Sequence, residues 1–474
     1  MYEDYKDKNQ FTLDGMVKNQ PYPMTLQSSI PFMPGGRLYM QMMNPDLKPV
    51  DFTDFRDETL SWHLTCSVSG GLNPTPMAVV KGPDAKKFMK DALVNKVDTW
   101  PVGTTKHGLM LTDDANIAAQ GVILHTDEDT YEAHWLSPYF DYVFLKGNYD
   151  ATLENITGQR VIFQTQGPNS LQMVENAAKE DLHDIKFGHF RNATIAGHKV
   201  RILRFGMYGC IGYEVHCAAG DSHDVYEALL RAGQPLGVRR LGFQAYMMDH
   251  TPGGSQQLGF HFMPSMDMEF AQAMMAQQSG GQSKMADEGL SLQWFMTGSL
   301  GEDMTKRLAN PYMLGLDYVC DYSRDFRGRE ALEAYKQDPH RRNICTLEWN
   351  YEDLGDIYMS QYRDEEPYAP MDWPGKPWSA VYGGQDVEMD KVLDKDGREI
   401  GWSAGRTTDY WYRAMVSDGI IEESYINEGD ELTIVWGNPG TRQKEVRAKV
   451  ARFPYNIHLR NKDFDVEQVP HYKG

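Results

Sequence analysis

Two stretches of the chain share one pattern of apolar and polar residues. MAVVKGPDAKKFMKDAL (77–93) and RVIFQTQGPNSLQMVENA (160–177) each run from an apolar strand through Gly-Pro into a segment with helical spacing of its apolar residues. Pro83 and Pro168 suit a first helical turn, where a missing N–H breaks no hydrogen bond. The pattern therefore predicts a pair of related α+β halves.

A second pair of strands follows the second unit. HKVRILRFG (198–206) and YEVHC (213–217) have the composition of strands, and SHDVYEALLRAG (222–233) that of a helix. Ser222 or Asp221 suits the N-cap of this helix, and Gly233 suits its end.

The stretch between these strands contains Gly206, Gly209 and Gly212, directly followed by Tyr213 and Glu214. One interpretation is a bulged hairpin whose glycines supply positive φ angles. The other is a backbone that leaves room for a flat ligand, with one carboxylate placed to hold it. The local pattern favours the hairpin and leaves both open.

The pattern changes after about residue 340. NICTLEWN, REIGWSAG and ELTIVWGN are short apolar strands separated by turn residues, which predicts a β-rich C-terminal domain. The Met- and Gln-rich segment 265–295 fits either a cover over a site or an irregular helical insertion, and the composition slightly favours the insertion.

Composition narrows the class of protein. The chain has 474 residues, enough for about three domains, and it is 41% hydrophobic and 24% charged, which is typical of globular proteins. Its net charge of −20 argues against nucleic acid or an anionic membrane as partners, because both require a basic face. The N-terminus lacks the pattern of a signal peptide, so we expect a cytoplasmic protein whose five scattered cysteines are free thiols.

Motif searches exclude several chemistries. The chain has no GxGxxG after a strand, no GxxxxGK[ST] and no HExxH, and its histidines lack metal-ligand spacing, so we expect no metal. GWSAG (401–405) matches the nucleophile elbow of hydrolases, but a β-like segment follows it where a helix is required. Tyr246, in RRLGFQAYMMDHTPGG, is by itself more typical of a core tyrosine with a solvated hydroxyl.

Several blocks together resemble one family. VVKGPDAKKF, QTQGPNSLQMV, ATIAGHKVRILRFGMYGCIGYEV, ANPYMLGLDYVCDYSRDFRGREAL, REIGWSAGRTTDYWYRAMV and GDELTIVWG are similar, in order and spacing, to the tetrahydrofolate-dependent aminomethyltransferase (glycine cleavage T-protein) superfamily. LGFQAY, NPYMLGLDY and LEWNYEDLGDIY look most like the bacterial vanillate and syringate O-demethylases within it.

The resemblance implies a three-domain cloverleaf, with two related α+β domains and a C-terminal β-barrel-like domain. We expect residues 1–55 with 158–250 to form the folate-binding domain. Residues 56–157 with 251–335 would form the second α+β domain, and residues 336–474 the barrel-like domain.

The resemblance also implies site residues. In the family, the glutamate at the position of Glu214 binds the pterin ring of tetrahydrofolate, and a carboxylate suits that edge because it accepts two parallel N–H bonds. Gln166, Gly206 and Tyr208 are expected next to the same cofactor. The O-demethylases have a catalytic tyrosine where Tyr246 stands.

The chain departs from the family in ways that bear on the substrate. Ala119 and Gln120 replace the Asp-Asp pair of the T-proteins, which makes transfer from a lipoyl arm a poor fit. The arginine that holds a benzoate carboxylate is absent from YEAHWLSPYF, which offers His134 and Trp135, and the family's His-rich turn is replaced around Asn73. We expect Asn73, Gln120, His134 and Trp135 to bind a neutral or larger aromatic ether.

The sequence therefore predicts a tetrahydrofolate-dependent O-demethylase that moves a methyl or methylene group from an aromatic ether to N5 of the folate. Expulsion of a phenolate is assisted by a proton from a group of similar acidity, and a tyrosine is well matched for this. Two alternatives stay open: a demethylase of an N-methyl or sulfonium donor, and a non-catalytic folate-binding accessory protein. A homo-oligomer is possible.

Overall fold

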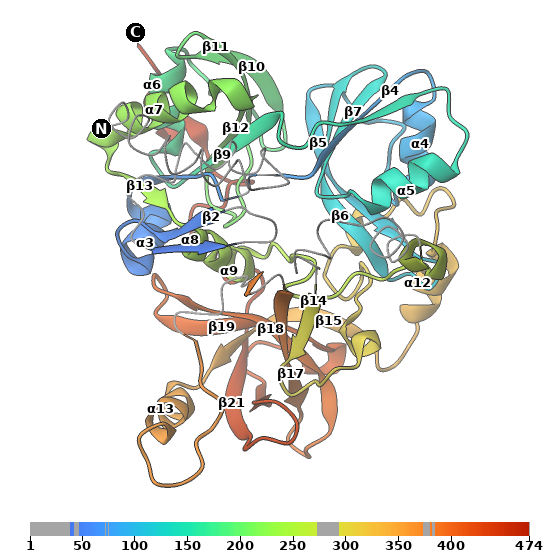
Figure 1. The fold of residues 1–474 in the computed structure, drawn as a ribbon, viewed down its shortest axis with the longest axis vertical. Helices are drawn as coiled ribbons and strands as arrows, with labels where there is room; N and C mark the ends of the chain where they lie inside the picture. The colour runs from blue at the N-terminus through green and yellow to red at the C-terminus, as the bar shows by residue number, and fades with distance from the viewer. Residues whose placement is uncertain are drawn as a thin grey trace, which may run out of the picture.

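The computed structural model describes residues 38–41, 47–71, 73, 75–272, 293–372, 380–381 and 384–473. These residues form three domains arranged as a cloverleaf (Figure 1). Most of the Met-rich segment 265–295 lies outside the described residues. In the part of the chain that is described, no helix combines the length and apolar character needed to cross a bilayer.

The first α+β domain is a six-stranded sheet with helices packed on it. Its strands are β3 (Cys66–Ser69), β9 (Arg160–Gln166), β10 (Phe190–Ile195), β11 (His198–Leu203), β12 (Gly212–Ala218) and β13 (Val238–Leu241). Its helices are α3 (Phe55–Leu64), α6 (Ser170–Ala178), α7 (Ser222–Gly233) and α8 (Phe243–Met248). The strand order is β10-β11-β12-β9-β3-β13, antiparallel except for the β3–β13 pair. Leu171 and Val174 of α6 and Val225 and Leu229 of α7 join the core against this sheet.

The second α+β domain is a five-stranded sheet in the order β5-β6-β7-β4-β8. Its elements are β4 (Met77–Lys81), α4 (Ala85–Ala92), β5 (Thr104–Leu111), β6 (Ile117–Asp127), β7 (Thr130–His134), α5 (Tyr139–Lys146) and β8 (Thr152–Asn155). Helices α4 and α5 lie on the side of the sheet away from the first domain (Figure 1). Phe88 of α4 and Phe140 of α5 pack edge to face, with ring centroids 4.9 Å apart.

The two α+β domains are related, as the repeated pattern predicts. The order β10-β11-β12-β9 in one sheet corresponds to β5-β6-β7-β4 in the other, and β9 and β4 each lead through Gly-Pro into a helix. Gly82 and Gly167 both have positive φ, and a Cβ on either would lie within 2.8 Å of neighbouring backbone. Only glycine fits both turns without strain. Pro83 and Pro168 lie in these turns, two residues before the helices begin.

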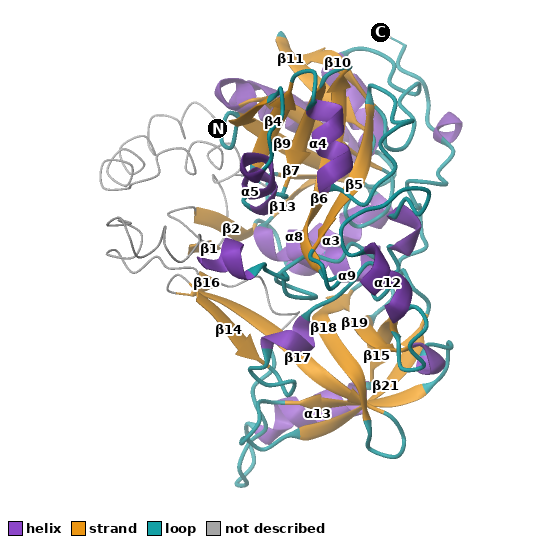
Figure 2. Ribbon diagram, turned by 90° about the vertical axis from the view of Figure 1, so that its right-hand side faces the viewer, coloured by secondary structure: helices purple, strands orange, loops and turns teal. Residues whose placement is uncertain are grey.

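The C-terminal domain is a closed six-stranded barrel. Its strands are β15 (Arg342–Trp349), β17 (Gly384–Leu393), β18 (Glu399–Asp409), β19 (Ala414–Glu422), β20 (Glu431–Trp436) and β21 (Lys444–Ala451). The order β17-β18-β19-β15-β21-β20 closes through the β17–β20 pairing. Figure 2 shows these strands below the α+β domains, with α13 (Tyr351–Ser360) at the far end. GWSAG lies within β18, so the structure offers no helix for a nucleophile elbow there.

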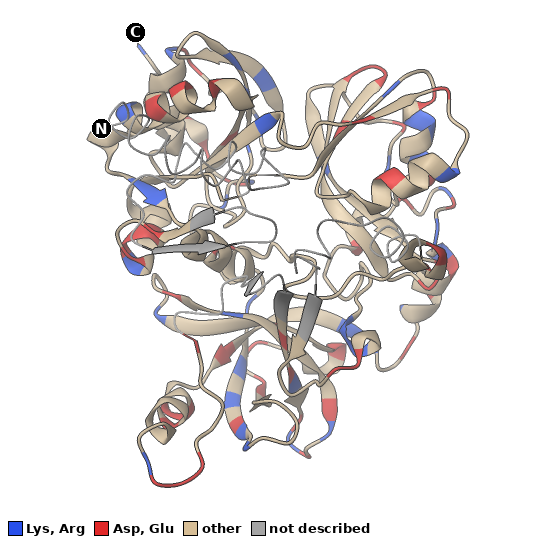
Figure 3. Ribbon diagram, in the orientation of Figure 1, with Lys and Arg blue, Asp and Glu red and all other residues tan. Residues whose placement is uncertain are grey.

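The described residues also contain six smaller helices and strands. They are β1 (Leu38–Gln41), β2 (Leu47–Asp51), α9 (His250–Gly253), β14 (Gln293–Thr297), α12 (Arg329–Tyr335) and β16 (Ala380–Val381). Acidic and basic residues are interspersed over all three domains (Figure 3). All five cysteines are free thiols, as expected.

The expected domain boundaries need three corrections. Strand β3 pairs with β9 and β13, so residues 56–71 belong with the first sheet rather than the second. Strand β14 pairs in parallel with β17, which joins it to the sheet of the barrel. Finally, Phe464, Val466 and Val469 return from the barrel to pack on the first domain's core.

This C-terminal return is anchored by buried hydrogen bonds. Arg204, 6% exposed, donates to the Oδ1 and backbone oxygen of Asn461 and to the backbone oxygen of Phe464 at 2.8–3.0 Å. Asn461 in turn donates to the backbone oxygen of Gly212 at 3.0 Å. The return therefore fixes the stretch that leads into β12.

We predict that Asn461→Ala lowers the free energy of unfolding by about 1–3 kcal/mol, because it leaves the buried Nε–H of Arg204 and the backbone oxygen of Gly212 without their partner. Thermal or urea unfolding measures this change. Lys395→Ala, in an exposed turn, serves as the control and should change stability by less than about 0.5 kcal/mol. Equal stability of the two variants would contradict the anchoring role.

Candidate active site

A cavity of about 1160 Å³ lies between the two α+β domains. Strands of both domains line it, and residues 253–258, 316–321 and 460–462 complete the wall. The apolar part of the wall includes Pro76, Trp135, Pro138, Phe187, Phe205 and Met207. A pocket for one drug-sized ligand is typically about 300–1000 Å³, so this cavity is large enough for a sizeable ligand.

Glu214 of β12 presents a buried carboxylate at this wall, with 5% of the residue exposed. Gln164 stands directly opposite on β9 and donates from Nε2 to Oε1 at 3.0 Å. The Nε2 atom of His216, two residues further along β12, lies 2.9 Å from Oε2. The two neighbours therefore fix the plane of the carboxylate and leave further lone pairs on both oxygens.

The charge of Glu214 is maintained despite its burial. Burial alone would raise its pKa, but the hydrogen bonds from His216 and Gln164 and the nearby imidazoles bring the pKa below its ordinary value. Oε1 of Gln164 is buried in the same wall without a hydrogen-bond partner among the described residues. This corner of the cavity thus offers acceptors to a ligand with adjacent N–H donors.

Tyr246 of α8 lines the cavity with its ring edge-on to that of His250, at a centroid distance of 5.2 Å. Burial raises the pKa of Tyr246 well above its ordinary value, and the charges of Asp249 and Glu214 raise it further. No hydrogen bond joins its hydroxyl to any described residue. Tyr246 is therefore a protonated donor at neutral pH.

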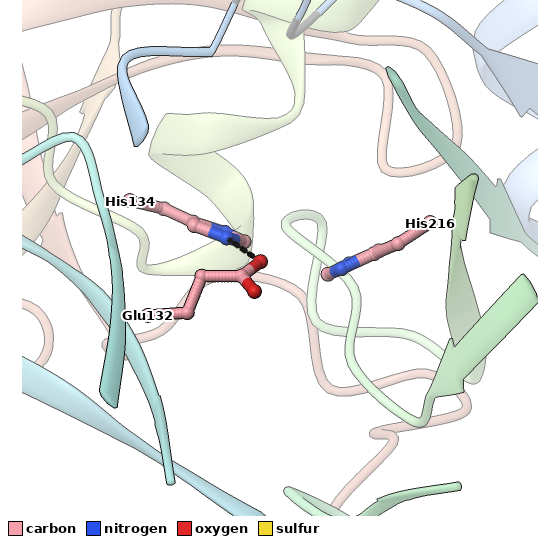
Figure 4. Close-up of side chains that lie close together, drawn as sticks. All are labelled: Glu132, His134 and His216. Carbon is pink, nitrogen blue, oxygen red and sulfur yellow. Dashed lines mark hydrogen bonds and ion pairs between the residues drawn. The ribbon is translucent and has the colours of Figure 1, made fainter. Parts of the chain in front are cut away.

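A second glutamate–histidine pair faces the first across the domain boundary. Glu132 and His134 of β7 are both 2% exposed, and His134 Nε2 lies 3.0 Å from Glu132 Oε1. The rings of His134 and His216 lie 5.5 Å apart (Figure 4). Arg201 of β11 donates to both oxygens of Glu132 at 2.9 and 3.1 Å, and Arg160 lies 2.9 Å from Oε2.

Glu132, His134 and His216 have ligand atoms close enough together to hold a metal ion. However, the carboxylate of Glu132 is already engaged by two guanidinium groups, and His216 Nε2 is engaged by Glu214. Two adjacent cations oppose a divalent ion. We therefore interpret this group as an ion-pair network that joins the two domains.

Known proteins resemble this chain over its length. Residues 75–251 match the model of the GCVT N-terminal domain. The chain is 37% identical to a sesamin methylene transferase of Sinomonas sp. over 89% of this chain and 93% of that protein. It is 26% identical to a syringate O-demethylase of Sphingobium sp. over 87% and 90%, respectively. The chain belongs to the GCVT-domain aminomethyltransferase family.

The fold agrees with this assignment. The crystal structure of the glycine cleavage system aminomethyltransferase T from Bartonella henselae superimposes with a TM-score of 0.63 at 15% identity, covering 90% of this chain and 95% of that one. The three-domain T-protein fold and the likeness to O-demethylases, both inferred from the sequence, are thereby confirmed.

The sequence predicts nine site residues for this chain, and six of them lie in the cavity wall. They are Gln120, His134, Trp135, Gly206, Glu214 and Tyr246. Trp135 has a φ of 69°, in the left-handed region that bulky residues rarely adopt, and strain of this kind often accompanies functional sites. The roles predicted for these residues remain predictions.

The other three predicted residues are absent from the wall and have structural partners. Gln166 donates to Asp249 at 3.3 Å and accepts from the backbone N–H of Tyr208. The Tyr208 hydroxyl donates to Asp409 at 3.0 Å, which joins the first domain to the barrel. Asn73 donates to and accepts from the backbone of Ile162, as a neighbouring strand would.

The sequence interpretation missed Gln164 and His216. Residues two apart on a strand share a face, so YEVHC already placed His216 beside Glu214. The position of Gln164 opposite Glu214 depends on the register of β9 against β12, which the local sequence pattern does not specify. Only Gly209 of the three glycines before Glu214 has positive φ, and a Cβ there would lie 2.0 Å from the Arg460 guanidinium. That glycine makes room for the protein's own chain.

We predict that Gly71→Ala lowers kcat by tenfold or more without unfolding the protein. A Cβ at Gly71 would lie 2.9 Å from Cγ of Tyr246, so the ring of this predicted catalytic residue must move, and small displacements of a catalytic group are costly. Steady-state kinetics and thermal unfolding measure the two effects. The control Gly220→Ala adds a Cβ with nothing within 4 Å. Unchanged kinetics in Gly71→Ala would show that the position of Tyr246 is unimportant.

Proposed function

We propose that this protein transfers a one-carbon unit from a neutral aromatic ether to N5 of tetrahydrofolate and releases a phenol. One observation carries the proposal: an ionised carboxylate, Glu214, and a protonated hydroxyl, Tyr246, line the same cavity. The first suits a pterin ring, and the second suits a phenolate leaving group. Family membership and the names of the similar proteins support the same reaction class.

The acceptors at the wall fit the cofactor. The aminopyrimidine edge of a pterin carries adjacent N–H donors, and the free lone pairs of Glu214 with the unpartnered Oε1 of Gln164 can receive them. Bound tetrahydrofolate would supply N5 as the nucleophile. Glu214 would hold the ring, and Gly206 would let it approach the backbone closely.

Tyr246 would act on the leaving oxygen. Its proton moves to the ether oxygen as the bond from that oxygen to carbon breaks, so that a phenol leaves instead of a phenolate. The proton lost from N5 balances the one gained by the phenol, so no oxidant or reductant is required. Donors of this kind typically contribute about a hundred- to ten-thousand-fold.

A neutral and bulky donor fits the wall better than a benzoate. The segment aligned to the benzoate-binding arginine contributes His134, Trp135, Ser137 and Pro138 to the wall and no arginine. Likeness to a sesamin methylene transferase favours a methylenedioxy donor. Transfer of its bridging carbon breaks two C–O bonds, forms bonds to N5 and N10, and moves both N–H protons to a catechol.

The accessory-protein alternative would rely on a characteristic cysteine near the folate site, and Cys210, in the glycine stretch before Glu214, is a poor candidate for that role. Burial raises the pKa of this thiol to about 12, and the residue is fully buried. A thiol in this environment is inert, because the thiolate is the reactive form.

We predict that Tyr246→Phe lowers kcat by about a hundred- to ten-thousand-fold for methoxyphenol and methylenedioxy donors. The loss should be much smaller for a nitrophenyl methyl ether, whose leaving group needs little protonation. Mass spectrometry of 5-methyl- or 5,10-methylene-tetrahydrofolate in anaerobic reactions measures both. Equal losses for both leaving groups would contradict proton donation, and activity confined to betaine or sulfonium donors would favour a different donor class.

We predict that Glu214→Gln weakens tetrahydrofolate binding by about ten- to a hundredfold, since hydrogen bonds to a charged group are worth about 1.5–3 kcal/mol. Anaerobic calorimetry measures the affinity. Glu154→Gln, on exposed β8, is the matched control and should bind as the wild type does. Unchanged binding in Glu214→Gln would place the folate elsewhere.

A further inference from the structure

The two related domains carry the same four-residue motif at equivalent positions. Tyr131–His134 reads Tyr-Glu-Ala-His on β7, and Tyr213–His216 reads Tyr-Glu-Val-His on β12. β7 and β12 occupy corresponding places in their sheets, each next to the strand that leads into Gly-Pro. In both copies the buried glutamate contacts the histidine two residues on, at 3.0 and 2.9 Å.

The copies differ in what else reaches the glutamate. Glu132 is bound by Arg201 and Arg160, which come from the other domain. Among the described residues, no lysine or arginine lies within ion-pair distance of Glu214, whose side-chain partners are Gln164 and His216. The carboxylate of Glu132 is therefore neutralised within the protein, whereas the carboxylate of Glu214 keeps a negative charge at the cavity wall.

His216 connects the two copies. It stands opposite Arg201 on β11 and Ile162 on β9, and its ring faces that of His134 on β7 (Figure 4). The ionised carboxylate of Glu214 only accepts, so Nε2 of His216 carries the hydrogen. Nδ1 is buried and has no hydrogen-bond partner among the described residues, which fits a neutral ring with its lone pair on that atom.

We propose that His216 is a positioning residue for tetrahydrofolate: its neutral ring fixes the carboxylate of Glu214, and protonation of the ring weakens folate binding. The proposal rests on the proposed function, in which Glu214 binds the pterin. An imidazolium beside Glu214 would neutralise the charge that the pterin N–H groups require.

The surroundings favour the neutral ring. Burial lowers the pKa of His216, while Glu214 raises it, and Arg201 and His134 lower it again, with a net shift below the ordinary value. Glu132 faces the cluster from β7 and is neutralised by Arg201 and Arg160. A bound pterin shares the Glu214 charge and lowers this pKa further. Affinity is therefore complete above about pH 6.5 and falls as the pH drops below it.

Two substitutions separate the effect of the His216–Glu214 hydrogen bond from the effect of protonating His216. His216→Gln keeps an N–H donor that does not titrate, and His216→Leu removes the donor. Tetrahydrofolate affinity is measured by anaerobic calorimetry from pH 5 to pH 8, with thermal unfolding to confirm that each variant is folded. His198→Gln, at the first residue of β11 and outside the cavity wall, is the control histidine substitution.

The expected results are distinct. At pH 7.5, His216→Leu binds about tenfold or more weakly, and His216→Gln stays within about threefold of the wild type. The affinity of His216→Gln changes less between pH 5 and pH 7 than that of the wild type. In Arg201→Met the loss of tetrahydrofolate affinity at low pH begins at a higher pH. Arg201 lowers the pKa of His216, so removing this cation raises that pKa.

Three results would overturn the proposal, each in a different way. If His216→Leu binds tetrahydrofolate as tightly as the wild type while Glu214→Gln binds it more weakly, only the role of His216 is overturned. A pH profile that is identical in wild type and His216→Gln overturns the protonation part. A wild-type protein that binds no tetrahydrofolate overturns the proposed function together with this inference.

Discussion

A carboxylate that stays ionised inside a protein wall is the constraint around which the first domain is organised. Removing a charge from water is costly, and the group protonates unless donors replace the lost water. His216 and Gln164 supply two donors to Glu214, and the cavity side of the carboxylate stays open. A ligand with adjacent N–H groups would complete the set, and in the proposed function the site binds and orients such a ligand.

The duplicated fold places a second buried carboxylate, that of Glu132, close to the ionised carboxylate of Glu214. Glu132 occupies the equivalent place in the other domain, but two arginines neutralise it and so hold the domains together. The same pair thus holds the domains together in one copy, and in the proposed function it binds the ligand in the other. Burial, together with the nearby charges of Asp249 and Glu214, raises the pKa of Tyr246, so its hydroxyl stays protonated beside the proposed folate position.

The barrel and the C-terminal return act as the frame of this site. Tyr208 donates to Asp409 of the barrel, and Arg204 is fixed by Asn461. These bonds flank the stretch that leads into Glu214. The glycine at position 209 serves this frame, because the guanidinium of Arg460 fills the space where a side chain would lie.

Much of the fold and part of the site could be predicted from the sequence. The repeated Gly-Pro units are local signals with strict backbone requirements, and the family resemblance singled out Glu214 and Tyr246, which the structure places in the cavity wall. The remainder depends on pairings between distant segments. The sequence analysis predicted Gln166 beside the cofactor, but the register of β9 against β12 places Gln164, not Gln166, opposite Glu214. Asn73 was predicted to bind the substrate, but its side chain is hydrogen-bonded to the backbone of Ile162. Such pairings leave no local pattern, as the misplaced β3 also shows.

The most direct test of the account is an isotope-tracing experiment. An aromatic ether carrying ¹³C in its methylenedioxy or methoxy carbon is incubated anaerobically with the protein and tetrahydrofolate, and ¹³C NMR follows the label. The account predicts that the label passes to the folate in amounts equal to the phenol or catechol released. Label in formaldehyde or formate, or phenol release without tetrahydrofolate, would contradict it.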